Sequence, residues 1–209
     1  MAGKITSLKY QKKNPSRVSV YLDDRFAFGL PAIVAARLAR GQFLSDPEIE
    51  ALQEEGLAET AYDKVLNYLS YRPRSRAEVE VYLQNREVPE SQISAIVERL
   101  EKVGLLDDEA FAQFWVENRE RFRPKGLRAL RYELRTKGLS DAVIERALTS
   151  VDTAESAYRS ARKKSRQLGH LDQQMFHRKI VEYLVRRGFE YEVAREAAER
   201  LWKELTVGE

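Results

Sequence analysis

The segment GLLDDEAFAQFWVENR, residues 104 to 119, combines carboxylates with aromatic side chains, a combination that can support acid–base chemistry. Asp107 and Asp108 are adjacent, and Phe111, Phe114 and Trp115 follow them closely. Catalysis requires the two carboxylates to converge with another acid or base in a cleft. Helix capping explains the same residues more simply, because a carboxylate before a helix accepts hydrogen bonds from free N–H groups. We therefore predict that Asp107 or Asp108 caps a helix whose buried stripe contains the three aromatics.

Other residue types that carry chemistry are scarce. The chain contains no cysteine, which excludes disulfides, thiolate zinc sites and cysteine nucleophiles. The two histidines, His170 and His177, are seven residues apart with Asp172 as the nearby carboxylate, which is a poor spacing for a metal site. No P-loop, dinucleotide-binding turn or Ser/His/Asp set is present. The sequence therefore predicts a protein that is not an enzyme and uses no cofactor and no metal.

Charge is distributed unevenly along the chain, although the net charge is only +3. Residues 45 to 64 carry seven acids and one base, whereas residues 117 to 140 carry eight bases against three acids. Residues 158 to 187 carry nine bases against two acids. Segregated charge of this kind is typical of proteins that bind a polyanion or an acidic protein, with a solvated helix face as the alternative interpretation.

The composition argues against membrane insertion and secretion. Hydrophobic residues make up 43% of the 209 residues and charged residues 33%, and no apolar run approaches the roughly 20 residues that span a bilayer. The N-terminal segment MAGKITSLKYQKK lacks the apolar core of about 7 to 15 residues found in secretory signals. Together with the absence of cysteine, this predicts a cytoplasmic protein.

Residues 1–56 differ in pattern from the rest of the chain. Residues 4 to 29 alternate in polarity and are rich in β-branched and aromatic side chains, which predicts strands. Turn-forming residues at positions 12–16 and at Asp23-Asp24 separate three such segments. We predict a small N-terminal antiparallel β-hairpin or meander.

Two helices are expected to follow these strands. The segment AIVAARLAR predicts a short helix that Gly41 stops. Ser45 and Glu48 have the spacing of a capping box, which opens a second helix. This second helix is predicted to run to Tyr71, with Gly56 as a point where it can break.

The rest of the chain contains a threefold repeat. Leu83, Leu134 and Leu184 occupy equivalent positions, 51 and 50 residues apart, and the aligned positions around them are apolar in every copy. The apolar positions follow the 3, 4, 7 spacing of one helix face. We predict a mainly α protein with three tandem three-helix repeats after the N-terminal segment, at residues 57–106, 107–151 and 152–209.

The repeats have a sharp turn before their last helix, as helix-turn-helix modules do, so DNA binding is a hypothesis to consider. Gly138 and Gly188 lie in these turns and suit a left-handed position just after a helix. The last helices lean acidic and lack the Asn, Gln and Arg set that reads base edges. Sequence-specific base reading is therefore disfavoured, and an autonomous helix-turn-helix nucleic-acid-binding protein is the alternative function.

Three segments carry a more specific signal: KVLNYLSYRPRS (64–75), VERLEKVGLLDDEAFAQFWVENR (97–119) and RPKGLRALRYELRTKGLSDAVIERAL (123–148). In type, order and interval they resemble the RecX regulators of the recombinase RecA, and the resemblance covers nearly the whole chain. It implies a cytoplasmic, non-enzymatic monomer in which the helix-turn-helix-like repeats form a curved array. It also implies a partner, the RecA filament on single-stranded DNA, whose recombination, strand exchange and ATP hydrolysis such proteins modulate, usually by inhibition.

The candidate contact residues are bases in three groups along the repeats. The first group surrounds Pro73, where Ser75 is placed to cap the next helix, and Arg72 and Arg74 look like arginines of the family motif. The second flanks the break at Pro124, and the third lies in the segment after residue 158. The candidates for contact with RecA or DNA are Arg72, Arg74, Arg76, Arg119, Arg121, Arg123, Lys125, Arg128, Arg131, Arg135, Arg159, Arg162, Lys163, Lys164 and Arg166.

Overall fold

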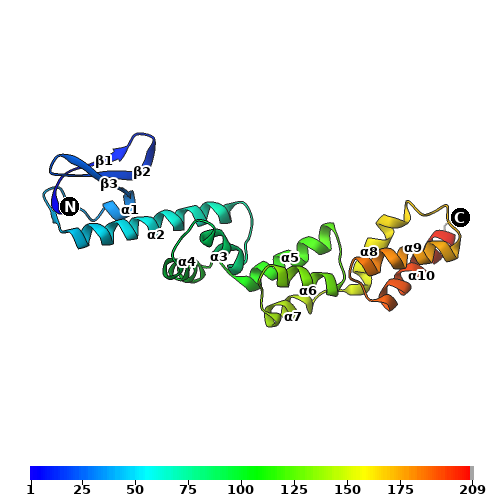
Figure 1. Ribbon diagram of the computed structural model, residues 1–209. Helices are drawn as coiled ribbons and strands as arrows, with labels where there is room; N and C mark the ends of the chain where they lie inside the picture. Colours follow the sequence, from blue (N-terminus) through cyan, green and yellow to red (C-terminus); the bar gives the residue numbers. More distant parts are fainter. Residues whose placement is uncertain (208–209) are drawn as a thin grey trace. The chain divides into compact units, whose positions relative to one another are not determined.

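The computed structural model describes residues 1–207, and it is mainly helical with a small antiparallel sheet at the N-terminal end (Figure 1). The predicted fold class is thereby confirmed. The chain divides into two compact units. The N-terminal unit consists of Met1–Arg72 and Val79–Val103, and the C-terminal unit consists of Pro73–Glu78 and Gly104–Glu209. In the described part of the chain, no helix is both long and apolar enough to cross a membrane.

The N-terminal sheet contains the predicted meander. Its strands are β1 (Gly3–Gln11), β2 (Asn14–Leu22), β3 (Arg25–Pro31) and β4 (Phe43–Leu44), in the order β3-β2-β1-β4. Asp23 and Asp24 both have positive φ, 48° and 66°, as the two central residues of a type I′ hairpin turn do. β4 was not predicted, because a two-residue strand has no readable alternation.

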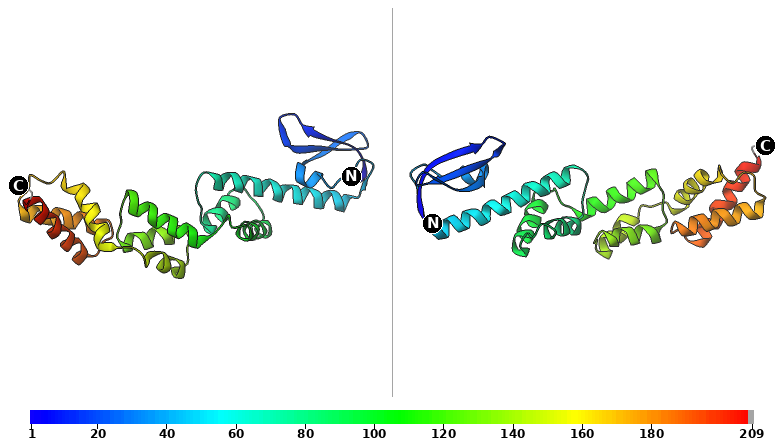
Figure 2. Two further views of the ribbon diagram at one scale, coloured as in Figure 1. Left: turned by 180° about the vertical axis from the view of Figure 1, so that it is seen from behind. Right: turned by 45° about the horizontal axis from the view of Figure 1, so that its top comes forward.

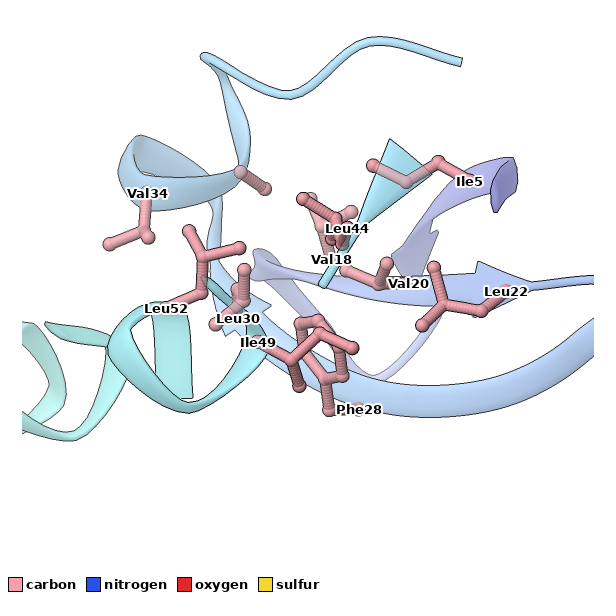
Figure 3. Packing of buried hydrophobic residues seen from close by; sticks show 11 residues of the cluster. Ile5, Val18, Val20, Leu22, Phe28, Leu30, Val34, Leu44, Ile49 and Leu52 are labelled. Atoms are coloured by element: carbon pink, nitrogen blue, oxygen red, sulfur yellow. The ribbon is translucent and has the colours of Figure 1, made fainter. Parts of the chain in front are cut away.

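One face of the sheet packs on two helices, α1 (Ala32–Ala35) and α2 (Asp46–Ser70). Alternate residues of β2 are buried, as the period of a strand with one solvated face requires. Figure 3 shows these side chains against those of the helices. The buried cluster includes Ile5, Val18, Val20, Leu22, Phe28, Leu30, Val34, Leu44, Ile49 and Leu52.

The two helices differ from their predicted extents. α1 ends at Ala35 rather than near Gly41, because the following segment turns back to pair with β1, where Gly41 N–H donates to Ile5 O at 2.7 Å. α2 runs unbroken through Gly56. A Cβ at Gly56 would lie 2.8 Å from Leu30 Cδ2, so this glycine permits close packing on β3 rather than a break. The predicted boundary at 56/57 therefore falls inside a helix.

The later helices follow the predicted three repeats. After α2 come α3 (Arg76–Gln84) and α4 (Glu90–Lys102), and the second set is α5 (Asp108–Phe122), α6 (Leu127–Thr136) and α7 (Asp141–Leu148). The third set is α8 (Thr153–Ser165), α9 (Gln173–Arg186) and α10 (Tyr191–Val207), which lie together in both views of Figure 2. The aligned residues Leu83, Leu134 and Leu184 are each 0% exposed. The repeat register is confirmed by this burial.

The turn before the last helix has the same left-handed residue in all three repeats. Glu87, Gly138 and Gly188 have φ of 58°, 79° and 85°. In each turn the N–H that follows donates back to the aligned leucine carbonyl, which is the bond of a Schellman cap. These bonds are Val88 N to Leu83 O at 3.3 Å, Leu139 N to Leu134 O at 3.3 Å and Phe189 N to Leu184 O at 3.2 Å.

Two of these turns dock on the start of a preceding second helix. In the C-terminal unit, a Cβ at Gly138 would lie 2.3 Å from Ala77 Cβ, and a Cβ at Gly188 would lie 2.5 Å from Ala129 Cβ. Glycine is therefore required at each of these two positions for two reasons, the left-handed φ and the close approach of the neighbouring alanine. Glu87, at the same position of the first repeat, is exposed. A side chain is accommodated only where the turn is open.

These turns predict opposite effects for two substitutions. Gly138→Ala is expected to lower the free energy of unfolding of the C-terminal unit by more than about 1 kcal/mol, from left-handed strain and the contact with Ala77. Glu87→Gly removes the same strain without breaking a contact and is expected to be neutral or stabilising. Urea unfolding followed by circular dichroism measures both. Equal stability of Gly138→Ala and the wild type would contradict the docking role of the glycine.

Candidate functional site

Asp107 and Asp108, the pair that could have formed an acidic active site, both bind backbone N–H groups. Asp107 is the N-cap of α5, and its Oδ1 accepts from Glu109 N at 2.8 Å and Ala110 N at 3.1 Å. Asp108 Oδ1 accepts from Arg76 N at 2.8 Å, at the start of α3. No group of three or more metal-ligating side chains occurs within residues 1–207. The pair joins two helix N-termini, and the predicted capping role is confirmed for Asp107.

The aromatic stripe after this cap is only partly as predicted. Phe111 is 2% exposed, but Phe114 is 38% exposed, so the prediction that Phe114 is buried was wrong. Ala112 and Val116 are buried in the helix face instead. Trp115 lies at the edge of this face, and its indole Nε1 donates to Glu133 Oε2 at 2.8 Å. The buried stripe therefore contains Phe111, Ala112 and Val116 instead of the three aromatics, because α5 packs chiefly against α7.

Glu133 on α6 binds two of the candidate bases. Arg119 Nε donates to its Oε2 at 2.8 Å, and Lys125 Nζ donates to its Oε1. Partial burial raises the pKa of Glu133, but the hydrogen bonds from Lys125, Arg119 and Trp115 together hold the pKa below its usual value. The carboxylate thus stays ionised and offsets one of the positive charges near the Pro124 break.

Three further candidates are paired with carboxylates. Arg131 donates to Glu145 at 2.7 Å, Arg135 to Asp141 at 2.9 Å, and Arg159 to Glu120 at 2.5 Å. Pairs this close to the surface contribute only about 0–1 kcal/mol each to stability. Their main effect is on charge, because a paired base attracts an external anion less strongly than an unpaired one.

The first group of candidates lies where α3 begins. Ser75 is fully buried and its Oγ accepts from Glu78 N at 3.2 Å, which confirms the predicted cap. The Ser75 hydroxyl also donates to Lys137 O at 2.7 Å, within the same compact unit. Arg72, Arg74 and Arg76 all take part in interactions, and none of them is without a partner. The segment around Pro73 is therefore a structural joint in its own right.

The remaining candidates have no carboxylate partner within residues 1–207. Three of them bind neutral groups: Arg128 donates to Val185 O at 3.3 Å, Lys163 to Phe122 O at 3.3 Å, and Lys164 to Gln167 Oε1 at 2.7 Å. Arg121 lies beside the Phe122 ring, at 5.2 Å from its centroid. For the side chains of Arg123, Arg162 and Arg166, the described residues supply no hydrogen-bond or ion-pair partner.

Several of these unpaired bases gather at one cavity between the end of α5 and α8. The cavity has a volume of about 320 Å³ and is lined by Arg121, Pro124, Arg159, Arg162, Lys163 and Arg166, together with Glu120. We refer to it as the α5–α8 cavity. It unites bases that the sequence analysis placed in two separate groups. The structure does not bring the group around Pro73 into this cavity.

The sequence analysis missed the acidic and hydroxyl residues that organise these bases. Glu120 Oε2 accepts from Ser156 Oγ and from Arg159, and Glu133 binds the bases near Pro124. The partners are 8 to 39 residues apart, so no single linear spacing connects them. The only signal was the presence of a few acids inside base-rich segments.

The cap of α5 yields a stability prediction. Asp107→Ala removes the acceptor of two backbone N–H groups and is expected to lower the free energy of unfolding by about 0.5–2 kcal/mol. Asp107→Asn keeps an oxygen acceptor at this position and should cost much less. Urea unfolding at neutral pH separates the two variants. Equal losses would show that the charge of Asp107, rather than its capping bonds, matters.

Glu133 yields a prediction on pH dependence. A carboxylate whose pKa is lowered on folding contributes stability above its unfolded pKa of about 4.3, and this contribution is lost as the pH falls through the folded pKa. The stability difference between the wild type and Glu133→Gln is therefore expected to be largest near pH 7 and to shrink as the pH falls below about 4. Urea unfolding between pH 7 and 3 measures it, with exposed Glu117→Gln as the control. A constant difference would contradict the role given to Glu133.

Known proteins resemble this chain along its whole length. Its residues match four family profiles: the regulatory protein RecX N-terminal domain at 3–45, and the RecX first, second and third three-helix domains at 61–100, 107–148 and 151–205. A regulatory protein RecX of Listeria monocytogenes is 30% identical over 99% of this chain and 78% of the relative. Those of Bacillus licheniformis and Bacillus subtilis are 34% and 32% identical, over 90% and 94% of this chain and 74% and 76% of theirs.

Solved structures agree with these sequence matches. A crystal structure of regulatory protein RecX aligns with a TM-score of 0.77 at 29% identity, covering 95% of this chain and 100% of that one. The crystal structure of RecX from Lactobacillus salivarius aligns with a TM-score of 0.62 at 28% identity, covering 69% and 96%. With four matched domains in order, the capped joints and the threefold repeat, this chain belongs to the RecX family of regulatory proteins.

Proposed function

We propose that this protein binds the RecA filament assembled on single-stranded DNA and modulates it by inhibition. The affected activities are recombination, strand exchange and ATP hydrolysis in DNA repair. The observation that carries the proposal is family membership over the whole chain, since relatives that are regulatory proteins RecX align with up to 99% of it. The resemblance of the motif segments to RecX regulators supports RecA as the protein that is regulated.

The geometry supports a binding role rather than a catalytic one. The carboxylates that could have formed an acidic centre accept from backbone N–H groups at helix starts, and the partly buried carboxylate of Glu133 is held by three donors. ATP hydrolysis is therefore assigned to the partner. The protein is proposed to act as a cytoplasmic monomer, without a cofactor.

The basic residues supply the attraction to the filament. A filament on single-stranded DNA contains a chain of phosphates, and unpaired bases bind such a chain with release of its counterions. In the C-terminal unit, the unpaired bases concentrate at the α5–α8 cavity. We propose that this cavity faces the filament, whereas bases paired with carboxylates contribute mainly to the fold.

The proposal is tested by the ATPase activity of RecA on single-stranded DNA, measured with increasing amounts of this protein. Hydrolysis should fall, and the protein should co-sediment with the filament. Neutralising three bases of the cavity, as Arg121→Gln, Arg162→Gln and Arg166→Gln together, should weaken the effect by about tenfold or more, equivalent to about 1.4 kcal/mol.

A matched variant neutralises three bases that are already paired, Arg131, Arg135 and Arg195. This variant loses the same three positive charges as the cavity variant. An equal loss of the effect on RecA in both variants would assign that effect to net charge alone. No binding and no change in RecA turnover by the wild type would refute the proposed function. Binding to a preferred sequence of naked duplex, with no effect on RecA, would favour an autonomous helix-turn-helix nucleic-acid-binding protein.

A further inference from the structure

We propose that the α5–α8 cavity is a binding site for one phosphate group, supplied by the backbone of a single nucleic acid strand. The inference rests on the proposed function only for the source of the strand, the filament on single-stranded DNA. The charges, the hydrogen bonds between its walls and the shape of the cavity support the site itself.

The cavity holds more positive charge than its own acid can neutralise. Five bases and one acid line it, and the acid, Glu120, is paired with Arg159 at 2.5 Å. The four other bases, Arg121, Arg162, Lys163 and Arg166, have no carboxylate partner within the described residues. Like charges held around one small volume repel each other, so an anion that enters relieves this repulsion.

The walls of the cavity are fixed before any ligand binds. Glu120 on α5 accepts from two residues of α8, Ser156 and Arg159, and Lys163 of α8 donates to Phe122 O at the end of α5. These hydrogen bonds connect the two helices on either side of the cavity. A site whose walls are already held loses less conformational entropy when a ligand binds.

The bases converge because of their helical spacing. Arg166 is the C-cap residue of α8 and has a helical backbone conformation, so it lies one turn from Arg162 on the same face. Arg121 reaches the cavity from the opposite wall, at the end of α5. Three guanidinium groups thus surround one space, and their forked donors match the oxygens of a phosphate.

One acceptor atom of the cavity lining, Glu120 Oε1, lacks a hydrogen-bond donor. Glu120 Oε1 is buried and accepts no hydrogen bond, whereas Glu120 Oε2 accepts two. Buried acceptors are nearly always satisfied, so an unsatisfied one indicates a missing donor. Because a phosphodiester has no proton to give, a water that bridges to the bound phosphate is the donor that fits.

Size and lining identify the ligand as a phosphate rather than a base or a protein element. A volume of about 320 Å³ is at the lower end of the roughly 300–1,000 Å³ usual for ligand sites. It accommodates a phosphate with its adjoining sugars, but no helix or strand. No aromatic ring is among the residues that line it, so base stacking does not contribute there. The site should therefore bind strands without regard to sequence.

Binding of a fluorescent oligothymidylate, measured by anisotropy without RecA, tests the site. Arg162→Gln with Arg166→Gln is expected to weaken binding about tenfold and to reduce the salt slope by about 0.7, the value for one phosphate of a single strand. The control, Lys179→Gln with Lys203→Gln, changes two exposed lysines of α9 and α10 outside the cavity and should keep the slope. Equal losses in both variants would overturn the site, because they indicate diffuse attraction.

Chemical acetylation of Lys163 gives a second readout that locates the phosphate. The oligothymidylate should protect Lys163 several-fold more than Lys203, as measured by mass spectrometry. Protection by millimolar inorganic phosphate, but not by the oligonucleotide, would overturn the strand as the source and leave a free phosphate as the ligand. Protection by neither probe would overturn the site itself.

The outcomes for this site and for RecA regulation are separable. Loss of oligonucleotide binding in the Arg162/Arg166 variant, with RecA still inhibited, would support the phosphate site and place the RecA contact elsewhere. Inhibition of RecA by a wild-type protein whose Lys163 is never protected would retain the proposed function and refute the phosphate site.

Discussion

The C-terminal unit depends on close approach of backbone to backbone where one repeat meets the next. Gly126 N–H donates to Arg187 O at 3.0 Å, and a Cβ on Gly126 would lie 2.0 Å from Gly188 O. Because no side chain can be inserted there, the turn before α10 is held directly on the start of α6. The turn before α7 is held on the start of α3 by a side chain instead: the Ser75 hydroxyl donates to Lys137 O, and Gly138 lies close to the Ala77 Cβ.

This joint explains how a surface can be shared by two repeats. Where the second and third repeats meet, hydrogen bonds of Glu120 and Lys163 connect the end of α5 to α8. Bases that are about 40 residues apart in sequence then line one cavity. Rigid placement of charge matters for binding a polyanion, since bases that are already held in place lose little entropy on binding.

The acids decide which bases are available to a partner. Glu133 binds Arg119 and Lys125, Glu145 binds Arg131 and Asp141 binds Arg135, so four of the eight bases of residues 117–140 are paired within the repeat. The bases of the α5–α8 cavity outnumber their acid, and their charge remains unbalanced. Counting bases along the sequence placed Arg121 in one group with Arg119 and Lys125, whereas the pairing and the cavity lining separate it from them.

The sequence by itself determined the strands, the repeats and the caps, because these depend on residues close in the chain. The period of apolar residues, the capping pair Ser75 and Glu78, and the left-handed glycines are all local signals. Only the tertiary structure decided the continuity of α2 through Gly56, the exposure of Phe114 and the pairing of each base. The physical reason is that packing and ion pairing join residues that are distant in sequence, and a linear pattern contains no information on which distant residues meet.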